Sequence, residues 1–320
     1  MKKFIIKVIL FISPIVIIAV LMEELLRKIP NDYQYKCSYL DHHSNDIKVL
    51  ILGSSHAYYG LDPRLMKYNS FNAAYVGQSL YYDWQIVKKY DHNWHHLKFI
   101  VLPVDYFSLY GKNESSVESW RVKDYQIYYG IHSTNYTDNS ELLSNKLLLN
   151  MGRIKSAYLS HESATLCSKL GWGTEYLIQK HKDLQSTGKV AAQRHLLIQQ
   201  GNFRENVAIL RAIIKYAVKN HVKVLLYTSP AYKSYVQNLN QRQLNSTINM
   251  LNTMSKRYSN VFYYNLLREK SFAQTDFYDA DHLDNIGAKK LTHEIDSLLL
   301  SIEKGHVTKF SAVMVPASVK

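Results

Sequence analysis

Four short apolar runs of strand length constrain the fold of this chain more than any other feature. Because nearly every residue in them is hydrophobic, each run fits a strand buried on both faces of a sheet. Stripes of apolar residues at helical spacing precede the last two runs, over 205–220 and 243–258, and an amphipathic segment over 286–304 follows them. Alternating helices and buried strands predict an α/β fold, with three α/β/α layers around a mostly parallel sheet. The runs are Ile47–Leu52, Leu97–Val104, Val222–Thr228 and Asn260–Leu267.

The beginning of the chain is apolar over a length that fits a membrane. Phe4–Met22 carries one charge, Lys7, and its length is close to the roughly 20 residues that cross a bilayer as a helix. Glu23 and Glu24 follow it instead of the small residues of a cleavage site, which predicts an uncleaved signal-anchor. A buried amphipathic helix is the alternative, but this segment is apolar on every face.

Lysines before and within the apolar run favour a cytoplasmic N-terminus, although basic residues also follow the run. We therefore expect a single-pass membrane protein whose remaining part lies outside the cytoplasm, at the cell envelope or surface. The expected division is an anchor at 1–28, a polar, irregular stalk at 29–46, an α/β/α domain at 47–305 with an insertion at about 106–200, and a tail at 306–320.

Composition narrows the classes of partner. The net charge is +13, but no basic run alternates with aromatic residues, which argues against nucleic acid. Cys37 and Cys167 stand at neither CxxC nor metal-ligand spacing and give no basis for predicting a disulfide. The three histidines of His92–Lys98 lack a carboxylate at ligand spacing and predict an exposed loop, so no metal site is expected.

A possible nucleophile stands where the first predicted strand ends, in the order Gly53, Ser54, Ser55, His56. A serine at a strand-to-helix turn can attack a carbonyl, because the helix N-terminus offers free N–H groups to the negative charge that develops. The alternative is that Ser54 or Ser55 only caps the following helix. His56 could line the same site, but its position next to Ser55 is a poor one for a base.

A candidate base lies more than two hundred residues further on, in Asp279–His282. An Asp and a His three residues apart can bring the carboxylate to imidazole Nδ1, which leaves Nε2 to face a serine, as in a Ser-His-Asp triad. The pair follows the last predicted strand and precedes the last helix. Because α/β folds place their sites at the carboxyl edge of the sheet, we predict that Ser55, His282 and Asp279 meet there.

The two segments, in this order, resemble the SGNH hydrolases, also called the GDSL esterase family. The resemblance implies that Ser55 is the nucleophile, with Ser54 in the family's Asp position, and that Asp279 and His282 carry the acid and base. It covers about residues 47–105 and 205–300, and it implies no metal and no organic cofactor.

The resemblance also implies an oxyanion site. In Phe71–Ser79 it offers Gly77 as a donor and Asn72 as a further site residue. The family's third block contains an Asn, but the corresponding segment Val101–Ser108 has none, so that donor is missing or replaced.

Membrane-anchored chains with such a Gly-Ser-Ser motif resemble proteins that move or remove acyl groups on cell-surface polymers. We therefore expect a serine-dependent esterase or O-acyltransferase that acts on acyl esters of a surface polysaccharide or related glycan, with acetyl as the first choice of acyl group. Its expected partners are that glycan, the membrane and a membrane acyl-donor protein. The alternative is a non-catalytic accessory protein that binds a glycan, for which the Tyr-rich part of the insertion could supply a surface, although packing is the favoured role of these tyrosines.

Overall fold

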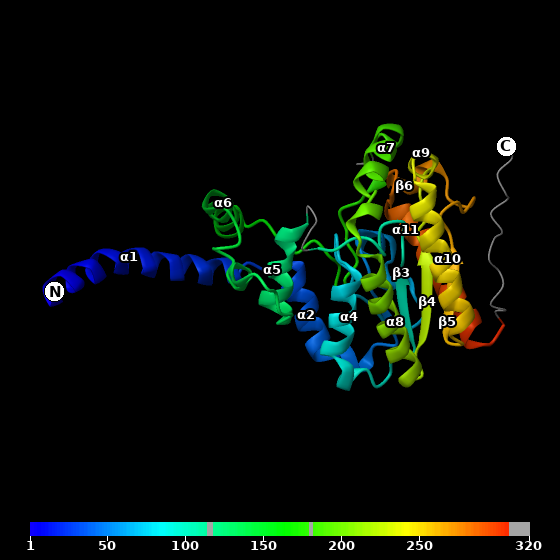
Figure 1. The fold of residues 1–320 in the computed structure, drawn as a ribbon, viewed down its shortest axis with the longest axis horizontal. Helices are drawn as coiled ribbons and strands as arrows, with labels where there is room; N and C mark the ends of the chain where they lie inside the picture. Colours follow the sequence, from blue (N-terminus) through cyan, green and yellow to red (C-terminus); the bar gives the residue numbers. More distant parts are fainter. Residues whose placement is uncertain (114–117, 179–181, 307–320) are drawn as a thin grey trace. The chain divides into compact units, whose positions relative to one another are not determined.

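The computed structural model describes residues 1–113, 118–178 and 182–306 and comprises two compact units (Figure 1). The first unit is Met1–Ser38 with Val117–Leu166, and the second is Tyr39–Ser116 with Cys167–Lys320. The insertion expected at about 106–200 therefore contributes residues to both units.

The second unit is built on a five-stranded sheet in which every neighbouring pair is parallel. The strand order is β2-β1-β3-β4-β5, and a separate antiparallel pair, β6-β7, follows in the sequence. The predicted α/β fold with a mostly parallel sheet is confirmed, because the four apolar runs become β1, β3, β4 and β5. The strands are β1 (Val49–Ile51), β2 (Ser70–Asn72), β3 (Phe99–Pro103), β4 (Lys223–Thr228), β5 (Val261–Asn265), β6 (Phe277–Asp279) and β7 (His282–Leu283).

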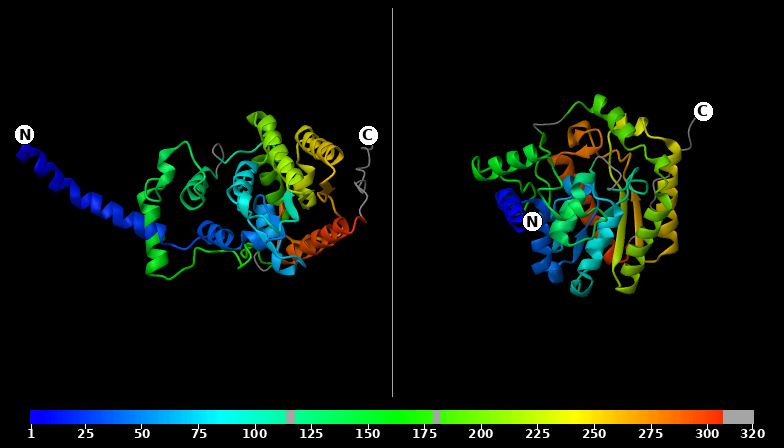
Figure 2. Two further views of the ribbon diagram at one scale, coloured as in Figure 1. Left: turned by 90° about the horizontal axis from the view of Figure 1, so that it is seen from below. Right: turned by 60° about the vertical axis from the view of Figure 1, so that its left-hand side comes forward.

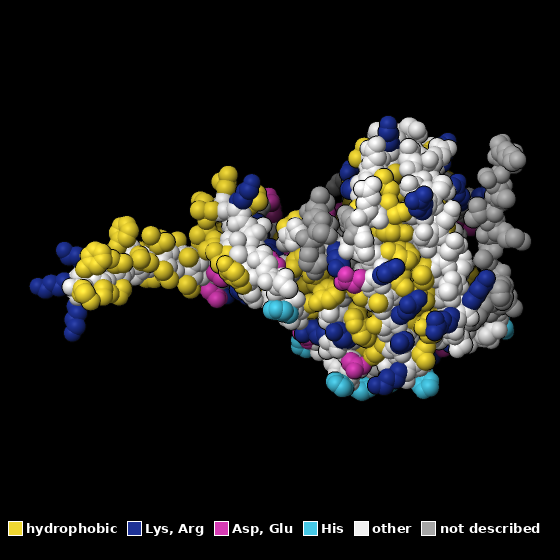
Figure 3. All heavy atoms as spheres, viewed as in Figure 1, with side chains coloured by type: hydrophobic (Ala, Val, Ile, Leu, Met, Phe, Trp, Pro, Cys, Tyr) yellow, Lys and Arg dark blue, Asp and Glu magenta, His cyan; other side chains and the backbone are white. Residues whose placement is uncertain are grey.

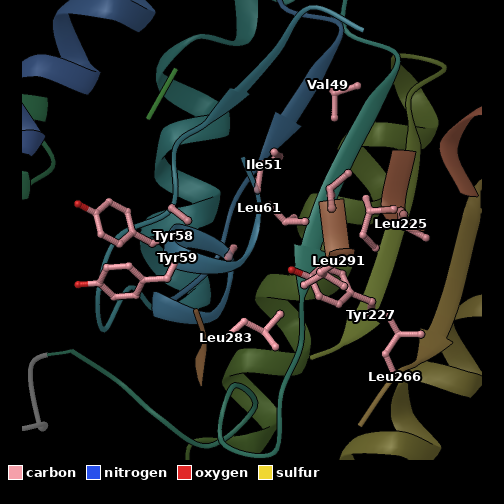
Figure 4. Close-up of a cluster of buried hydrophobic side chains, with 14 of the residues drawn as sticks. Val49, Ile51, Tyr58, Tyr59, Leu61, Leu225, Tyr227, Leu266, Leu283 and Leu291 are labelled. Carbon is pink, nitrogen blue, oxygen red and sulfur yellow. The ribbon is translucent and has the colours of Figure 1, made fainter. Parts of the chain in front are cut away.

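Helices flank this sheet, and the core lies between helices and strands. Val49 and Ile51 of β1 pack in one cluster with Leu291 of α11, and Figure 4 shows these side chains together. Leu50 points to the opposite face and is also fully buried, as expected for a strand covered on both sides. The helices are α3 (Ser55–Gly60), α4 (Leu80–Lys89), α7 (Leu184–Arg194), α8 (Phe203–Lys219), α9 (Lys233–Gln237), α10 (Gln241–Arg257) and α11 (Asn285–Glu303), with the 3-10 turns η1 (Ser44–Asp46), η2 (Pro63–Leu65), η3 (Asp91–Asn93), η8 (Ile198–Gln200) and η9 (Gln274–Asp276).

The first unit is mostly helical. Its longest element, α1 (Lys2–Arg27), is the one helix among the described residues that is long and apolar enough to cross a membrane. Figure 2 shows α6 beside the C-terminal end of α1, where the Tyr158 hydroxyl donates to the Leu25 carbonyl at 2.8 Å. The other elements are η4 (Ser119–Arg121), α5 (Val122–Asp124), the π-helical turn η5 (Tyr125–Tyr129), η6 (Tyr136–Asn139) and α6 (Leu147–Tyr158).

The segment 29–46 differs from the irregular stalk that its polar composition predicts. It contains α2 (Asp32–His43), which has residues in both units. Tyr33, Cys37 and Leu40 are buried, and their spacing of four and three residues places them on one helical face. This apolar stripe, which the surrounding polar residues obscure in the sequence, explains why the segment is a helix.

Other expectations concern single residues. Cys37 and Cys167 are both free thiols. All three histidines of His92–Lys98 are exposed, as predicted for a surface loop. Four tyrosines of the insertion serve packing, since Tyr106, Tyr110, Tyr125 and Tyr129 are buried. The predicted tail at 306–320 lies almost wholly outside the described residues.

Candidate active site

Ser55 stands at the carboxyl end of β1 and is the first residue of α3. From Val49 to Gly60 every residue is buried except Ser55, which is half-buried. Gly53 has a φ of +113°, and a Cβ at this position would lie 2.7 Å from Pro103 Cγ of β3. The turn therefore requires glycine both for its backbone conformation and for its packing on β3. The result is a tight turn whose accessible side chain is that of Ser55.

The structure brings Ser55, His282 and Asp279 together. His282 Nε2 lies 2.8 Å from Ser55 Oγ, and His282 Nδ1 lies 2.9 Å from Asp279 Oδ1. Because a carboxylate only accepts hydrogen bonds, Nδ1–H donates to Asp279 and Nε2 is left to accept from the Ser55 hydroxyl. The backbone N–H of His282 also donates to Asp279 Oδ1, at 2.9 Å, which fixes the carboxylate beside the imidazole. This arrangement can remove a proton from the serine hydroxyl.

The sheet topology explains how these residues meet. The chain passes from β1 outward to β2 and then returns to β3 on the other side of β1, so the strand order reverses between β1 and β3. Open α/β sheets bind ligands outside the carboxyl ends of the strands at this kind of switch point. Ser55 follows β1 there, and the β6-β7 pair carries Asp279 and His282 to it.

Ser54 and Gly77 lie in loops at this edge. The Ser54 carbonyl accepts from the N–H groups of Ala57 and Tyr58, so its backbone begins α3, whereas its buried hydroxyl has no hydrogen-bond partner among the described residues. Gly77 precedes α4, has a φ of +72°, and accepts a 2.8 Å hydrogen bond on its carbonyl from Asn113 Nδ2. The roles of Ser54 and Gly77 toward a substrate stay predictions.

Asn72 ends β2 and is fully buried. Its Nδ2 donates to the carbonyls of Ala57 and Leu61, both at 2.8 Å, and its Oδ1 accepts from the Ala74 N–H at 3.0 Å. Both amide protons are therefore engaged by backbone around α3. This gives Asn72 a clear structural task, and its role as a site residue stays a prediction.

A second imidazole–carboxylate pair, which the sequence did not predict, lies next to the first. His56 Nδ1 is 2.8 Å from Asp105 Oδ2, and Asp105 Oδ1 accepts from the Ser229 N–H at 2.8 Å. Asp105 follows β3, in the segment where the SGNH-like pattern would have its Asn. The His56 ring centroid is 4.9 Å from that of His282, so the two imidazoles are direct neighbours.

Asp281 lies among the imidazoles. Its Oδ2 is 3.7 Å from His56 Nε2, and its Oδ1 is 3.7 Å from His282 Nδ1. Residues from the end of α7 approach the same carboxylate, with Arg194 at 3.4 Å and His195 Nδ1 at 3.8 Å. The insertion therefore contributes charge to the candidate site.

The buried charges shift one another's proton affinity. Burial alone would lower the pKa of His56, but the carboxylates of Asp105 and Asp281 outweigh it and raise that pKa to about 10. Burial would raise the pKa of Asp281, but the neighbouring His282 and His56 hold it well below its usual range. Burial lowers the pKa of His195 to about 3, despite the attraction of Asp281. At neutral pH the cluster thus contains a His56 imidazolium, an ionised Asp281 and a neutral His195.

An aromatic stack flanks the pair of Ser55 and His282. The Tyr176 ring lies between those of Tyr59 and Tyr278, with centroid separations of 3.7 and 3.8 Å. The edge of this stack faces His282, whose ring centroid is 5.4 Å from that of Tyr176. Because Tyr176 and Tyr278 are only half-buried, the stack offers an aromatic wall beside the candidate nucleophile.

Among the described residues, one group of possible metal ligands has its atoms close together, and it is formed by His56, Asp281 and His282, within 4.8 Å of one another. Two of these side chains already have short partners, His56 on Asp105 and His282 on Asp279. The observed geometry is thus that of a hydrogen-bonded charge cluster.

Two solved structures are similar to this chain at a low level. One is of a presumed platelet activating factor from Streptococcus pneumoniae, with a TM-score of 0.41 and 12% identity over 91% of this chain and 98% of that chain. The other is of a presumed acylhydrolase from Bacteroides fragilis, with a TM-score of 0.39 and 10% identity over 82% of this chain and 95% of that chain. No family model and no curated protein matches the chain. The similarity to these structures is too low to support a function.

Proposed function

We propose that the chain is a serine-dependent esterase or O-acyltransferase with Ser55 as its nucleophile. The observation that carries this proposal is the hydrogen-bonded series from Ser55 Oγ to His282 to Asp279, at 2.8 and 2.9 Å. Its connectivity is that of a Ser-His-Asp triad. The SGNH-like motifs at Gly53–Ser55 and Asp279–His282 support the same reading, because they predict this set of residues from the sequence.

In the proposed reaction His282 Nε2 takes the Ser55 proton while Oγ attacks an acyl carbonyl. Asp279 orients the imidazole and stabilises the imidazolium that forms, and general base catalysis of this kind contributes roughly 10²–10⁴-fold to a rate. The backbone N–H groups of Ser55 and Gly77 are the proposed donors to the oxyanion. The bond to the alcohol breaks as this alcohol takes the proton from His282. Water or a glycan hydroxyl then gives its proton to His282 as it attacks the acyl-enzyme, and the bond to Ser55 Oγ breaks as His282 returns that proton to the serine.

The proposed substrate is an acyl ester of a surface polysaccharide or related glycan, with acetyl as the first choice of acyl group. Two observations support it. α1 can anchor the chain in a membrane, which would keep the site near a polymer made there. The half-buried Tyr176 and Tyr278 place the edges of their stacked rings beside the site, and a glycan could pack against these edges. We propose that the α/β unit lies outside the cytoplasm and that a membrane acyl-donor protein is its partner when the reaction is a transfer.

A fluorophosphonate probe tests the nucleophile directly. The full chain in detergent micelles should be labelled on Ser55, and Ser55→Ala and His282→Ala should each abolish labelling. Ser271→Ala is the matched control, because Ser271 is exposed and belongs to no part of the site. Labelling that survives both site substitutions in folded protein would refute the proposed nucleophile.

Hydrolysis of p-nitrophenyl acetate separates the enzyme from the non-catalytic alternative. Turnover above the Ser55→Ala background supports an esterase or transferase, and an acetylated glycan formed when an oligosaccharide is added identifies a transferase. Turnover equal to that background, with retained binding of the glycan, would identify an accessory binding protein.

A further inference from the structure

The helix α6 has its apolar side chains on the outside. Leu147, Leu148 and Leu159 are 58%, 80% and 74% exposed, and Met151 is also exposed. At about 100° per residue Leu147, Leu148 and Met151 share one face of the helix, and Leu159 directly follows its last residue. Figure 3 shows hydrophobic side chains over α6 next to those of α1. A helix that packs in water turns such a face inward, so this orientation is inverted.

The inward face of α6 makes polar contacts. Asn150 is fully buried, and its Nδ2 donates to the Leu142 carbonyl at 3.0 Å. Arg153 binds the fully buried Glu141 at 2.7 Å, and Glu141 also binds Lys123 at 2.8 Å. These contacts fix the rotation of α6, because turning its leucines inward would separate Arg153 from the buried Glu141 and Asn150 from the Leu142 carbonyl. The exposed leucines are therefore held outward by polar contacts on the other side of the helix.

Hydrogen bonds place residues 139–142, which shortly precede α6, at the end of the apolar part of α1. The Glu23 carboxylate accepts from the Ser140 hydroxyl at 2.7 Å and from the Leu142 N–H at 2.8 Å, and Arg27 donates to the Asn139 carbonyl. Glu23 directly follows Phe4–Met22. Since a helix rises about 1.5 Å per residue, contacts at Glu23 to Arg27 lie within about 8 Å of the last apolar residue. If α1 crosses a membrane, α6 is therefore at the height of the bilayer surface.

The remaining exposed side chains suit a lipid surface. Lys146 and Lys155 are exposed on or beside α6, and Tyr136 is 82% exposed in η6. Tyrosines gather at the membrane–water boundary, and long basic side chains reach from it toward anionic headgroups. A helix with leucines on one face and basic residues along the border is the pattern of an interfacial helix.

We propose that α6 lies in the headgroup–acyl boundary of the bilayer that α1 crosses, with Leu147, Leu148, Met151 and Leu159 facing the acyl chains. The inference rests on the membrane-anchoring role proposed for α1 and is independent of the proposed chemistry at Ser55. It assigns α6 as a second membrane contact next to the anchor.

Site-directed spin labelling of the full chain in phosphatidylcholine–phosphatidylglycerol vesicles tests this position. In a Cys37→Ala, Cys167→Ser background, a label at Leu148→Cys is compared with one at Val218→Cys, an exposed apolar position of α8. The label at Leu148 should collide more with oxygen than with a water-soluble nickel chelate, and its nickel collision rate should be severalfold below that at Val218.

The possible outcomes distinguish the interfacial position of α6 from the membrane anchoring by α1 on which it rests. Protein that floats with vesicles and resists carbonate extraction, yet has equal nickel collision rates at Leu148 and Val218, overturns the interfacial position and leaves the anchor intact. Dipolar broadening between Leu148 labels, with low access to both reagents, would identify a second copy as the partner of α6 and also overturns it. Failure to float removes the anchor and the inference together, while labelling of Ser55 by the probe would be unaffected.

Discussion

His56 gives the sharpest prediction about stability, because its charge depends on the folded structure. The groups that face it are Asp105 after β3, Asp281 between β6 and β7, His282 in β7 and His195 after α7. Its pKa of about 10 compares with 6.5 for a free imidazole. A pKa that is raised on folding stabilises the fold fully below pH 6.5, and this contribution is lost as the pH rises toward 10.

The magnitude follows from the difference between the two pKa values. At about 1.4 kcal/mol per pH unit, the His56 proton contributes about 4 kcal/mol to the free energy of unfolding at pH 7 and between about 1 and 2 kcal/mol at pH 9. His56→Gln removes the positive charge and leaves Asp105 and Asp281 without it. We therefore expect the variant to be less stable than the original chain by about 4 kcal/mol at pH 7, and this gap should narrow by about 2–3 kcal/mol at pH 9.

Urea unfolding of the full chain in detergent micelles, followed by tryptophan fluorescence between pH 6 and 9.5, measures this gap. Titrating groups that do not face His56 affect both proteins alike and cancel in the difference. His92→Gln is the matched control, because His92 is exposed, and its effect should stay within about 0.5 kcal/mol at every pH. A gap that does not change with pH, or one that widens toward pH 9, would refute a protonated His56.

Three further predictions concern buried groups near the sheet edge. Asn72→Ala should lower the free energy of unfolding in urea by about 3 kcal/mol, because it leaves three backbone groups without their partner. The folded variant should still react with the fluorophosphonate. A variant that is stable but is not labelled would instead indicate an oxyanion role for Asn72. Burial raises the pKa of Asp83 to about 7, so the contribution of Asp83 to the free energy of unfolding should fall by about 3 kcal/mol as the pH rises from 4 to 7. The difference in stability between the original chain and Asp83→Asn should change by this amount over that range, and a difference that does not change with pH would contradict it. Gly188→Ala places a methyl group against Ser234 of α9 and should lower the free energy of unfolding by about 2 kcal/mol or more, which is measured as a lower melting temperature. Gly152→Ala is the control, because a Cβ at Gly152 meets nothing within 4 Å, and it should not lower the melting temperature.

The parts of the fold that the sequence predicts are those with enough residues to show a pattern. β3 and β4 have five and six residues, nearly all apolar, and their burial on both faces can be read directly from the sequence. β2 has three residues and β7 has two, which is too few for any periodicity to show. α2 was missed because its buried stripe is interrupted by polar residues. The inverted orientation of α6 depends on Glu141 and Lys123, which precede the helix, so its own sequence does not tell which face is inside.

The candidate site also has residues that the sequence predicts and residues that only the folded structure brings together. Ser55, His282 and Asp279 could be placed together because the two motifs follow predicted strands, and parallel strands end at one edge. His56 and Asp105 each follow a strand as well, but nothing in the sequence indicates that the two side chains pair. His195 carries no local signal, because it reaches Asp281 only through the packing of α7 in the folded unit. Sequence spacing thus predicts the reacting groups, while the surrounding charges follow from tertiary structure.

The end of α7 has a practical consequence for engineering this chain. Arg194 and His195 lie beside Asp281, and the Lys182 N–H donates to the Tyr278 carbonyl within the same unit. A shortened version that deletes the stretch from Cys167 to His195 would expose Asp281 to water and remove a support of β6. Substitutions at Arg194 or His195 would instead alter the charge around Asp281 and His282 without touching any residue of the serine–histidine–aspartate series. The end of α7 is therefore the natural position at which to retune the chemistry of the site while leaving its reacting groups in place.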